Sequence, residues 1–347
     1  MLPELAAGLI VFGLTAYLVL GGADFGAGFW DLTAGGARRG ARLRGMIKLA
    51  MGPVWEANHV WLIFVLVVFW TAFPVAFGSV TSTLYVPLFA AAVGIIFRGA
   101  AFALRGEAAT IAEARALGAT FALSSVLVPF FLGAVVGGIA SGRVPIGNAS
   151  GDALTSWWNP TSVLVGALTV AAGAHLAAAF LAADSVRAGQ PDMVRAFRAR
   201  ALGSGVAAGA LAIAGLFVVR EDARSLYDGL TSGGGLALVL ASGLAGLVTL
   251  GLEWRSRFEW ARYTAAVAVG SIVAGWAVAQ RPELLPGQLT LDEAAANDAT
   301  LVALLISVAA GMLVVLPSLR YLFRLVLRGD LDTEFRPLSA GDDRTQA

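Results

Sequence analysis

The sequence predicts an all-α, polytopic membrane helix bundle with about nine transmembrane helices. Of its 347 residues, 58% are hydrophobic and only 14% are charged, whereas soluble domains carry about 25% charged residues. Apolar stretches long enough to cross a bilayer, which takes about 20 residues, recur along the chain. The basic residues gather in alternate connections between these stretches. Together these observations indicate a membrane protein that crosses the bilayer many times.

The nine predicted spans are stretches in which about 20 mainly apolar residues follow one another. They cover residues 5–29, 47–72, 78–103, 116–139, 161–183, 201–219, 234–252, 260–280 and 299–322. No basic segment precedes the first stretch, so we interpret it as a transmembrane helix rather than a cleaved signal. We expect residues 1–328 to form a single transmembrane helical domain and residues 329–347 to form a polar cytoplasmic tail.

The distribution of basic residues predicts the orientation of the spans. Of the 24 Lys and Arg residues, twenty fall on the side that holds the connection after the first span. The other side holds Arg143, Arg220, Arg224 and Arg281. Cytoplasmic loops carry an excess of basic residues. We therefore expect the N-terminus outside and the C-terminus in the cytoplasm.

The composition also excludes several kinds of site. The net charge is only +1, whereas a nucleic-acid partner would require a basic patch or stripe. There is no cysteine, which excludes disulfides, thiolate metal sites and cysteine nucleophiles. A haem or metal site usually needs two or more ligands, and the chain has only two histidines. We therefore expect no metal site or cofactor on this chain, and we expect His175 to be hydrogen-bonded between helices.

Three ionisable residues lie at membrane depth in the predicted cytoplasmic half: Asp24, Glu56 and Arg98. Such groups are costly in a span and usually face a partner, a cavity or an ion path. One interpretation is that Asp24 or Glu56 pairs with Arg98 and ties three helices together. The other is a proton path, because a buried carboxyl group can both take up and release a proton near neutral pH. Both stay open for Asp24 and Arg98.

For Glu56 we favour the proton path. Glu56 lies about 13 Å from the cytoplasmic end of its span, at roughly 1.5 Å per residue, and no basic residue except His59 lies within a turn of it. His59 is three residues away and shares its helix face. Trp55, Asn58 and Trp61 fall on an overlapping arc of the same helix, and we expect them, with Arg98, to be structural or interface residues.

Two G-x-x-x-G pairs predict close helix packing. They are Gly22 with Gly26 and Gly133 with Gly137. Residues of this size let two helix backbones approach closely in lipid. We expect both pairs to lie at contacts between helices.

Five segments in the first third of the chain, taken in order and spacing, resemble subunit II of the bacterial cytochrome bd quinol oxidases. They are GGADFGAG at residues 21–28, GPVWEANHVWLI at 52–63, FWTAFPVAF at 69–77, LYVPLF at 84–89 and FRGAAFALRG at 97–106. The resemblance implies nine spans with the N-terminus outside. It also implies a multi-pass protein of the bacterial plasma membrane.

The resemblance further implies a heterodimer with a larger subunit I, which carries the haems b and d and the quinol site. Such a complex oxidises quinol and reduces dioxygen to water, taking protons from the cytoplasm without pumping. In this family the acidic residue after the first Trp of the WEANHVW segment is implicated in the proton path, which points to Glu56, and we add Asp24 and His59 to that path. The resemblance leaves room for a small single-span accessory subunit and for a structural quinone.

Two other classes of function stay open on the sequence. A proton-coupled secondary transporter would show inverted repeats and broken helices near the midplane. Here the polar interruptions are confined to the first three spans, without a later counterpart of similar strength. A purely structural membrane scaffold is the second alternative, and it predicts that Glu56 is dispensable.

Overall fold

The computed structural model describes residues 1–36, 40–51, 55–105 and 107–328. The side chains of residues 51, 55, 56, 111, 323 and 326–328 also lie outside the described part. The chain divides into two compact units, Met1–Leu301 and Val302–Ala347, and in the second unit the described residues continue helix α14.

The first half of the first unit is built from the N-terminal helices, which include the segments of the family resemblance. These are α1 (Leu2–Ala16), the π-helix η1 (Tyr17–Gly21), α2 (Gly22–Leu32), α3 (Ala41–Met51), α4 (Trp55–Ala72), α5 (Pro74–Thr83), α6 (Tyr85–Leu104) and α7 (Ile111–Ala140). The segments α1, η1 and α2 follow one another without a break. The helix α4 runs antiparallel to them, since Asn58 lies beside Asp24 and Phe64 lies beside Gly13.

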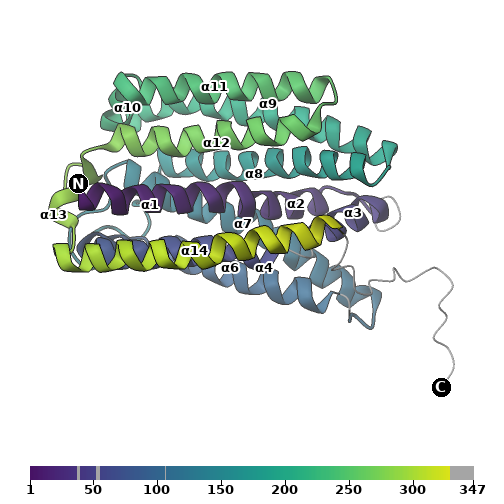
Figure 1. The fold of residues 1–347 in the computed structure, drawn as a ribbon, viewed down its shortest axis with the longest axis horizontal. Helices are drawn as coiled ribbons and strands as arrows, with labels where there is room; N and C mark the ends of the chain where they lie inside the picture. Colours follow the sequence, from purple (N-terminus) through teal and green to yellow (C-terminus); the bar gives the residue numbers. More distant parts are fainter. Residues whose placement is uncertain (37–39, 52–54, 106, 329–347) are drawn as a thin grey trace. The chain divides into compact units, whose positions relative to one another are not determined.

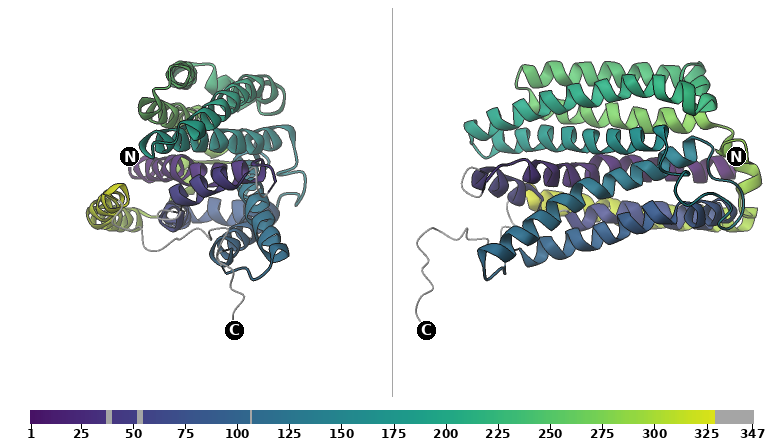
Figure 2. Two further views of the ribbon diagram at one scale, coloured as in Figure 1. Left: turned by 90° about the vertical axis from the view of Figure 1, so that its right-hand side faces the viewer. Right: turned by 180° about the vertical axis from the view of Figure 1, so that it is seen from behind.

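The second half of the first unit is a four-helix group with short additional elements. Its segments are α8 (Pro160–Arg187), α9 (Pro191–Asp222), α10 (Arg224–Leu230), α11 (Gly233–Trp254), α12 (Phe258–Gln280), β1 (Glu283–Leu285), β2 (Leu289–Thr290) and α13 (Leu291–Ala294), followed by the start of α14 (Asp298–Arg328). The strands β1 and β2 form a short antiparallel hairpin. Figure 1 shows α8, α9, α11 and α12 running side by side, and the left view of Figure 2 looks along them.

The structure confirms an all-α, multi-pass membrane fold. Among the described residues, eight helices are long and apolar enough to cross a membrane, and the apolar part of α4, Ala57–Ala72, is a shorter ninth. The helices α2, α6, α8 and α11 end, and α3, α7, α9 and α12 begin, at one end of the first unit, to the right in Figure 1. We call it the arginine-rich end, because these helix ends and connections carry most of the basic residues of the unit.

The predicted third span, residues 78–103, is wrong as a single helix. The chain forms α5 up to Thr83, leaves helical geometry at Leu84 (φ −98°, ψ 27°) and restarts as α6 at Tyr85. Pro87 explains the break. It lacks the N–H group that would bond the carbonyl of Thr83 in a continuous helix, and proline is accepted in the first turn of a new helix.

Two further helix boundaries differ from the predicted spans. The first predicted span, 5–29, lies within a longer helical segment that contains the π-helix η1, in which the N–H of Gly22 bonds the carbonyl of Tyr17. A π-helical turn holds one more residue than an α-helical one, and apolar periodicity does not reveal it. Within the second predicted span, 47–72, α3 ends at Met51 and α4 begins at Trp55, and residues 52–54 lie outside the described part.

The two glycine pairs lie at helix contacts, as expected. A Cβ atom added to Gly26 of α2 would lie 1.9 Å from the carbonyl oxygen of Gly173 in α8. A Cβ added to Gly137 of α7 would lie 2.5 Å from the Cα of Ser162, also in α8. The helix α8 therefore touches α2 and α7 backbone to backbone. Ala177, Ala178 and the neighbouring small residues of α8 are buried in the same region.

This geometry predicts that Gly26→Ala destabilises the fold. The added methyl group meets the main chain rather than a side chain that could move aside, so α2 and α8 must separate. We expect a loss of about 1–3 kcal/mol in the free energy of unfolding, measured by thermal denaturation of the purified protein in detergent. Gly8→Ala in α1 is the matched control, since nothing lies within 4 Å of its added Cβ. Equal stability of the two variants would contradict the close contact.

Candidate functional site

A buried polar cluster lies where η1, α2, α4, α6 and α7 meet, in the half of the unit nearer the arginine-rich end. Its members share polar or titratable side chains that contact one another or the neighbouring main chain: Tyr17, Asp24, Asn58, His59, Arg98 and Ser125. All except His59 are buried, and His59 is partly buried. The cluster brings together Asp24, Asn58, His59 and Arg98, which the sequence singled out. Tyr17 and Ser125 were missed, because a hydroxyl in an apolar helix gives little signal.

Asp24 and Asn58 join α2 to α4. The Nδ2 group of Asn58 donates a hydrogen bond to the Oδ2 atom of Asp24. The same group lies 3.4 Å from the carbonyl oxygen of Leu20, in η1. Asp24 is 7% exposed and Asn58 is 5% exposed. Asn58 therefore positions a carboxyl group that is removed from lipid and solvent.

Arg98 holds three helices through main-chain and hydroxyl acceptors. Its Nη2 donates to the carbonyl oxygen of Asp24 at 3.0 Å, and its Nε donates to the Oγ of Ser125 at 3.1 Å. The guanidinium carbon also lies 4.6 Å from the ring centre of Phe25 and 5.2 Å from that of Phe121, within the range of cation–π attraction. Of the described hydrogen bonds of Arg98, the one that reaches Asp24 goes to its main-chain carbonyl. Arg98 thus bonds the backbone of α2 directly.

Tyr17 and His59 form the deeper part of the cluster. The hydroxyl of Tyr17 lies 3.4 Å from the Nδ1 atom of His59. The His59 ring also packs against the ring of Phe25, with 5.9 Å between their centres. Tyr17 begins the π-helical turn, and such turns occur frequently at functional sites. The turn places a hydroxyl group beside the imidazole inside the bundle.

Glu56 and Trp55 begin α4, immediately before Asn58 and His59. The side chains of Glu56 and Trp55 lie outside the described residues, so their predicted roles stay predictions. Trp61, one turn further along α4, is 6% exposed and packs edge-to-face against Phe12 of α1 at 5.5 Å between ring centres.

A second charged group, missed by the sequence, closes the arginine-rich end of α2. Asp31 is 4% exposed, and its carboxylate accepts hydrogen bonds from Arg44 Nε at 2.6 Å and from Arg105 Nη1 at 2.5 Å. These contacts tie the end of α2 to α3 and α6. The sequence offered one indication of this group. Asp31 lies two residues past the predicted end of the first span, and arginines lie in the connections that follow the first and third predicted spans.

His175 lies between α8 and α9, as predicted. Its Nδ1 atom is 3.1 Å from the carbonyl oxygen of Ala201, so it is hydrogen-bonded between helices. Its Nε2 atom lies 3.8 Å from Glu253 of α11, a buried residue that the sequence missed.

The two histidines are the side chains to consider first as possible ligands of a haem or a metal ion. Within the described part of the chain, no three His, Cys, Asp or Glu side chains come together to hold a metal. The imidazole of His59 contacts Tyr17 and Phe25, and that of His175 contacts Ala201 and Glu253. Each ring thus has one nitrogen atom, Nδ1, within hydrogen-bond distance of a protein group.

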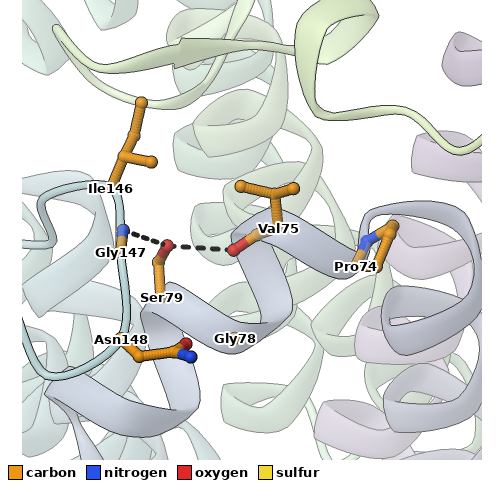
Figure 3. A pocket seen from close by; sticks show the side chains of 7 residues that line it. All are labelled: Pro74, Val75, Gly78, Ser79, Ile146, Gly147 and Asn148. Atoms are coloured by element: carbon orange, nitrogen blue, oxygen red, sulfur yellow. Dashed lines mark hydrogen bonds between the residues drawn. The ribbon is translucent and has the colours of Figure 1, made fainter.

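A surface hollow lies at the opposite end of the unit, away from the cluster. It encloses about 360 Å³ and is lined by Pro74, Val75, Gly78, Ser79, Ile146, Gly147 and Asn148. Figure 3 shows the Ser79 hydroxyl accepting a bond from the Gly147 N–H and donating one to the Val75 carbonyl. None of these lining side chains is titratable, and the hollow lies where α5 meets the connection between α7 and α8.

The fold and the cluster define a multi-pass membrane protein with ionisable groups enclosed between its helices. The family model of cytochrome bd terminal oxidase subunit II matches residues 2–326. The chain therefore belongs to this family, and its resemblance to subunit II is confirmed.

Two relatives illustrate the similarity. The chain is 27% identical, over 125 residues, to cytochrome bd ubiquinol oxidase subunit 2 of Bacillus subtilis (strain 168), a match that covers 36% of this chain and 36% of that protein. A chain of the bd oxidase structure from Geobacillus thermodenitrificans shares the fold with a TM-score of 0.75 and 27% identity. That match covers 94% of this chain and 99% of the other.

The contacts of Arg98 predict a strong effect of its removal on stability. Arg98→Ala removes two hydrogen bonds from a charged donor and leaves the Asp24 carbonyl without that donor, so the free energy of unfolding should fall by about 3 kcal/mol or more. Arg195→Ala, at an exposed position near the same end, should change it by less than about 0.5 kcal/mol. Thermal denaturation in detergent compares the two, and similar midpoints would contradict the bracing role of Arg98.

Proposed function

We propose that this chain is subunit II of a respiratory bd-type terminal oxidase, a complex that oxidises quinol and reduces dioxygen to water. The chain packs against a haem-bearing subunit I in the bacterial plasma membrane. It contributes a proton path that enters from the cytoplasm through Glu56 and includes Asp24 and His59. Family membership and the buried polar cluster beside the start of α4 support this proposal.

The arginine-rich end is the cytoplasmic end in this proposal. The excess of basic residues in the connections at this end supports the assignment. Glu56 is the second residue of α4, so protons meet it early on their way into the membrane. The outside N-terminus and the cytoplasmic C-terminus follow from the same assignment.

The residues of the cluster have distinct tasks in the proton path. Asp24 and His59 hold a proton at a carboxyl oxygen and at a ring nitrogen, whereas Asn58 orients the Asp24 carboxyl group and does not titrate. The backbone of Tyr17 lies seven residues before Asp24 in a helical segment, or about 10 Å deeper at roughly 1.5 Å per residue, and its hydroxyl lies beside His59. The order Glu56, Asp24, His59, Tyr17 thus leads away from the arginine-rich end.

The haems belong to the partner subunit in this proposal, where they carry electrons from quinol to dioxygen. The small number of possible haem ligands on this chain, two histidines and no cysteine, supports this assignment. The present chain supplies protons, excludes water through its packed helices and binds the partner. Arg98 and Asp31 keep the helices around Asp24 and α3 in place.

The proposal predicts that Glu56→Gln slows turnover and leaves the haems in place. Gln keeps the size of the side chain but carries no acidic proton, so quinol-dependent oxygen uptake should fall about tenfold or more. The complex is purified through a tag on this chain, its haem content is read from the absorption spectrum, and oxygen uptake is followed with an electrode. Glu107→Gln is the matched control, because Glu107 is an exposed residue at the same end.

Three results would contradict the proposal or the role of Glu56 in it. If no haem-bearing partner purifies with the wild-type chain, the chain is not part of an oxidase. If Glu56→Gln retains the full uptake rate with its haems, Glu56 carries no essential proton and the chain acts as a scaffold. A loss of haem in this variant would assign Glu56 to assembly instead of the proton path.

A further inference from the structure

A second pair of titratable residues is buried in the four-helix group of α8, α9, α11 and α12. Glu253 of α11 is fully buried, and neither of its carboxyl oxygens has a hydrogen-bond partner in the described part of the structure. The nearest charged or chargeable group that pairs with it is His175 of α8, whose Nε2 atom lies 3.8 Å from Oε1. A buried carboxyl group without a donor is costly, so this arrangement requires an explanation.

The hydrogen bond on the other side of the ring fixes the tautomer of His175. Its Nδ1 atom lies 3.1 Å from the carbonyl oxygen of Ala201 in α9. A carbonyl oxygen only accepts, so Nδ1 must carry the proton. In the neutral ring the Nε2 atom is then a bare acceptor, and it faces the carboxyl group of Glu253.

No hydrogen atom therefore lies between His175 Nε2 and a deprotonated Glu253 carboxyl group. With a deprotonated Glu253 and a neutral His175, two acceptors face each other and the site carries a buried negative charge. One proton on either atom creates a donor and makes the site neutral. We propose that His175 and Glu253 form a proton-binding site, which takes one proton from solution and shares it between the Glu253 carboxyl group and His175 Nε2.

Glu253 lies close to the arginine-rich end of α11, whereas His175 lies near the middle of the longer helix α8. Only one residue of α11 follows Glu253, and that residue, Trp254, is 69% exposed. Arg198 of α9 donates to the carbonyl of Trp254. The bonds that close the end of α11 therefore separate the carboxyl group from the surface.

Several other charged groups on the surrounding helices have contacts with groups other than Glu253 and His175. They are Asp184 and Arg187 on α8, Arg198 and Arg200 on α9, and Glu259 and Arg262 on α12, while Asp192 and Arg195 lie in the first turns of α9 and Arg220, Glu221 and Asp222 lie at its other end. Arg187 pairs with both Asp184 and Glu259, and Arg262 pairs with Glu259. Arg200 donates to the carbonyl of Ala196, and Arg198 donates to that of Trp254. Among the described ion pairs, Glu253 occurs only with His175. The proton is therefore shared within this pair.

This proposal is independent of the proton path through Glu56, because it concerns other helices and is tested without turnover. The complex, in lipid nanodiscs, is titrated with acid and base while infrared difference spectra record the C=O absorption of protonated carboxyl groups. We expect one titrating absorption that Glu253→Gln removes and that Glu253→Asp moves in frequency. Glu259→Gln, at a partly exposed carboxyl group near the same end, is the control and should leave it in place.

The decisive variant is His175→Gln, which keeps a donor for the Ala201 carbonyl but removes the ring acceptor. If the two groups share a proton, the midpoint of the Glu253 absorption should shift by about one pH unit or more. An unchanged midpoint in this variant would overturn the shared site. So would the absence of any titrating absorption that responds to Glu253→Gln or Glu253→Asp.

Discussion

The contact between α2 and α8 is the constraint on which the rest of the first unit depends. At Gly26 there is no room for a Cβ atom, because the carbonyl oxygen of Gly173 would lie 1.9 Å from it. One turn further, the Trp30 indole donates to the carbonyl of Ala174 at 2.8 Å. Helices in lipid associate through such packing and hydrogen bonds rather than through the hydrophobic effect. The same contact fixes both buried sites, since Asp24 precedes Gly26 by two residues and His175 follows Gly173 by two.

The low polarity of the surroundings explains why the polar groups near this contact are tied so closely. A membrane interior offers no water to an unpaired donor, so the guanidinium group of Arg98 must find acceptors in the protein. It finds the carbonyl of Asp24 and the hydroxyl of Ser125. One of these acceptors belongs to the main chain of α2. The need of Arg98 for acceptors therefore fixes α6 against the helix that carries Asp24.

Much of this fold follows from the sequence, because a span must be apolar over about 20 residues and loops carry the arginines. The sequence also identifies Asp24 and Arg98, since ionisable residues inside apolar runs are conspicuous. It misses the break at Leu84, because every residue there is compatible with a helix except Pro87. It misses Glu253 for another reason. That residue ends an apolar run beside Arg255, as a loop residue would, and only the packing of α8 and α9 around it makes it buried.

Hydrogen-bond satisfaction distinguishes the two buried sites more clearly than burial does. A side chain that only braces helices gains stability when its polar atoms are bonded, and the Nε and Nη2 atoms of Arg98 both are. A group that binds and releases a proton must instead keep an atom available for it. Both oxygens of Glu253 meet that condition in the described structure, and they face a ring nitrogen whose other side is already fixed. A deprotonated Glu253 without a hydrogen-bond donor is unfavourable inside the bundle. Binding one proton removes the charge and creates a donor, so the arrangement favours proton binding.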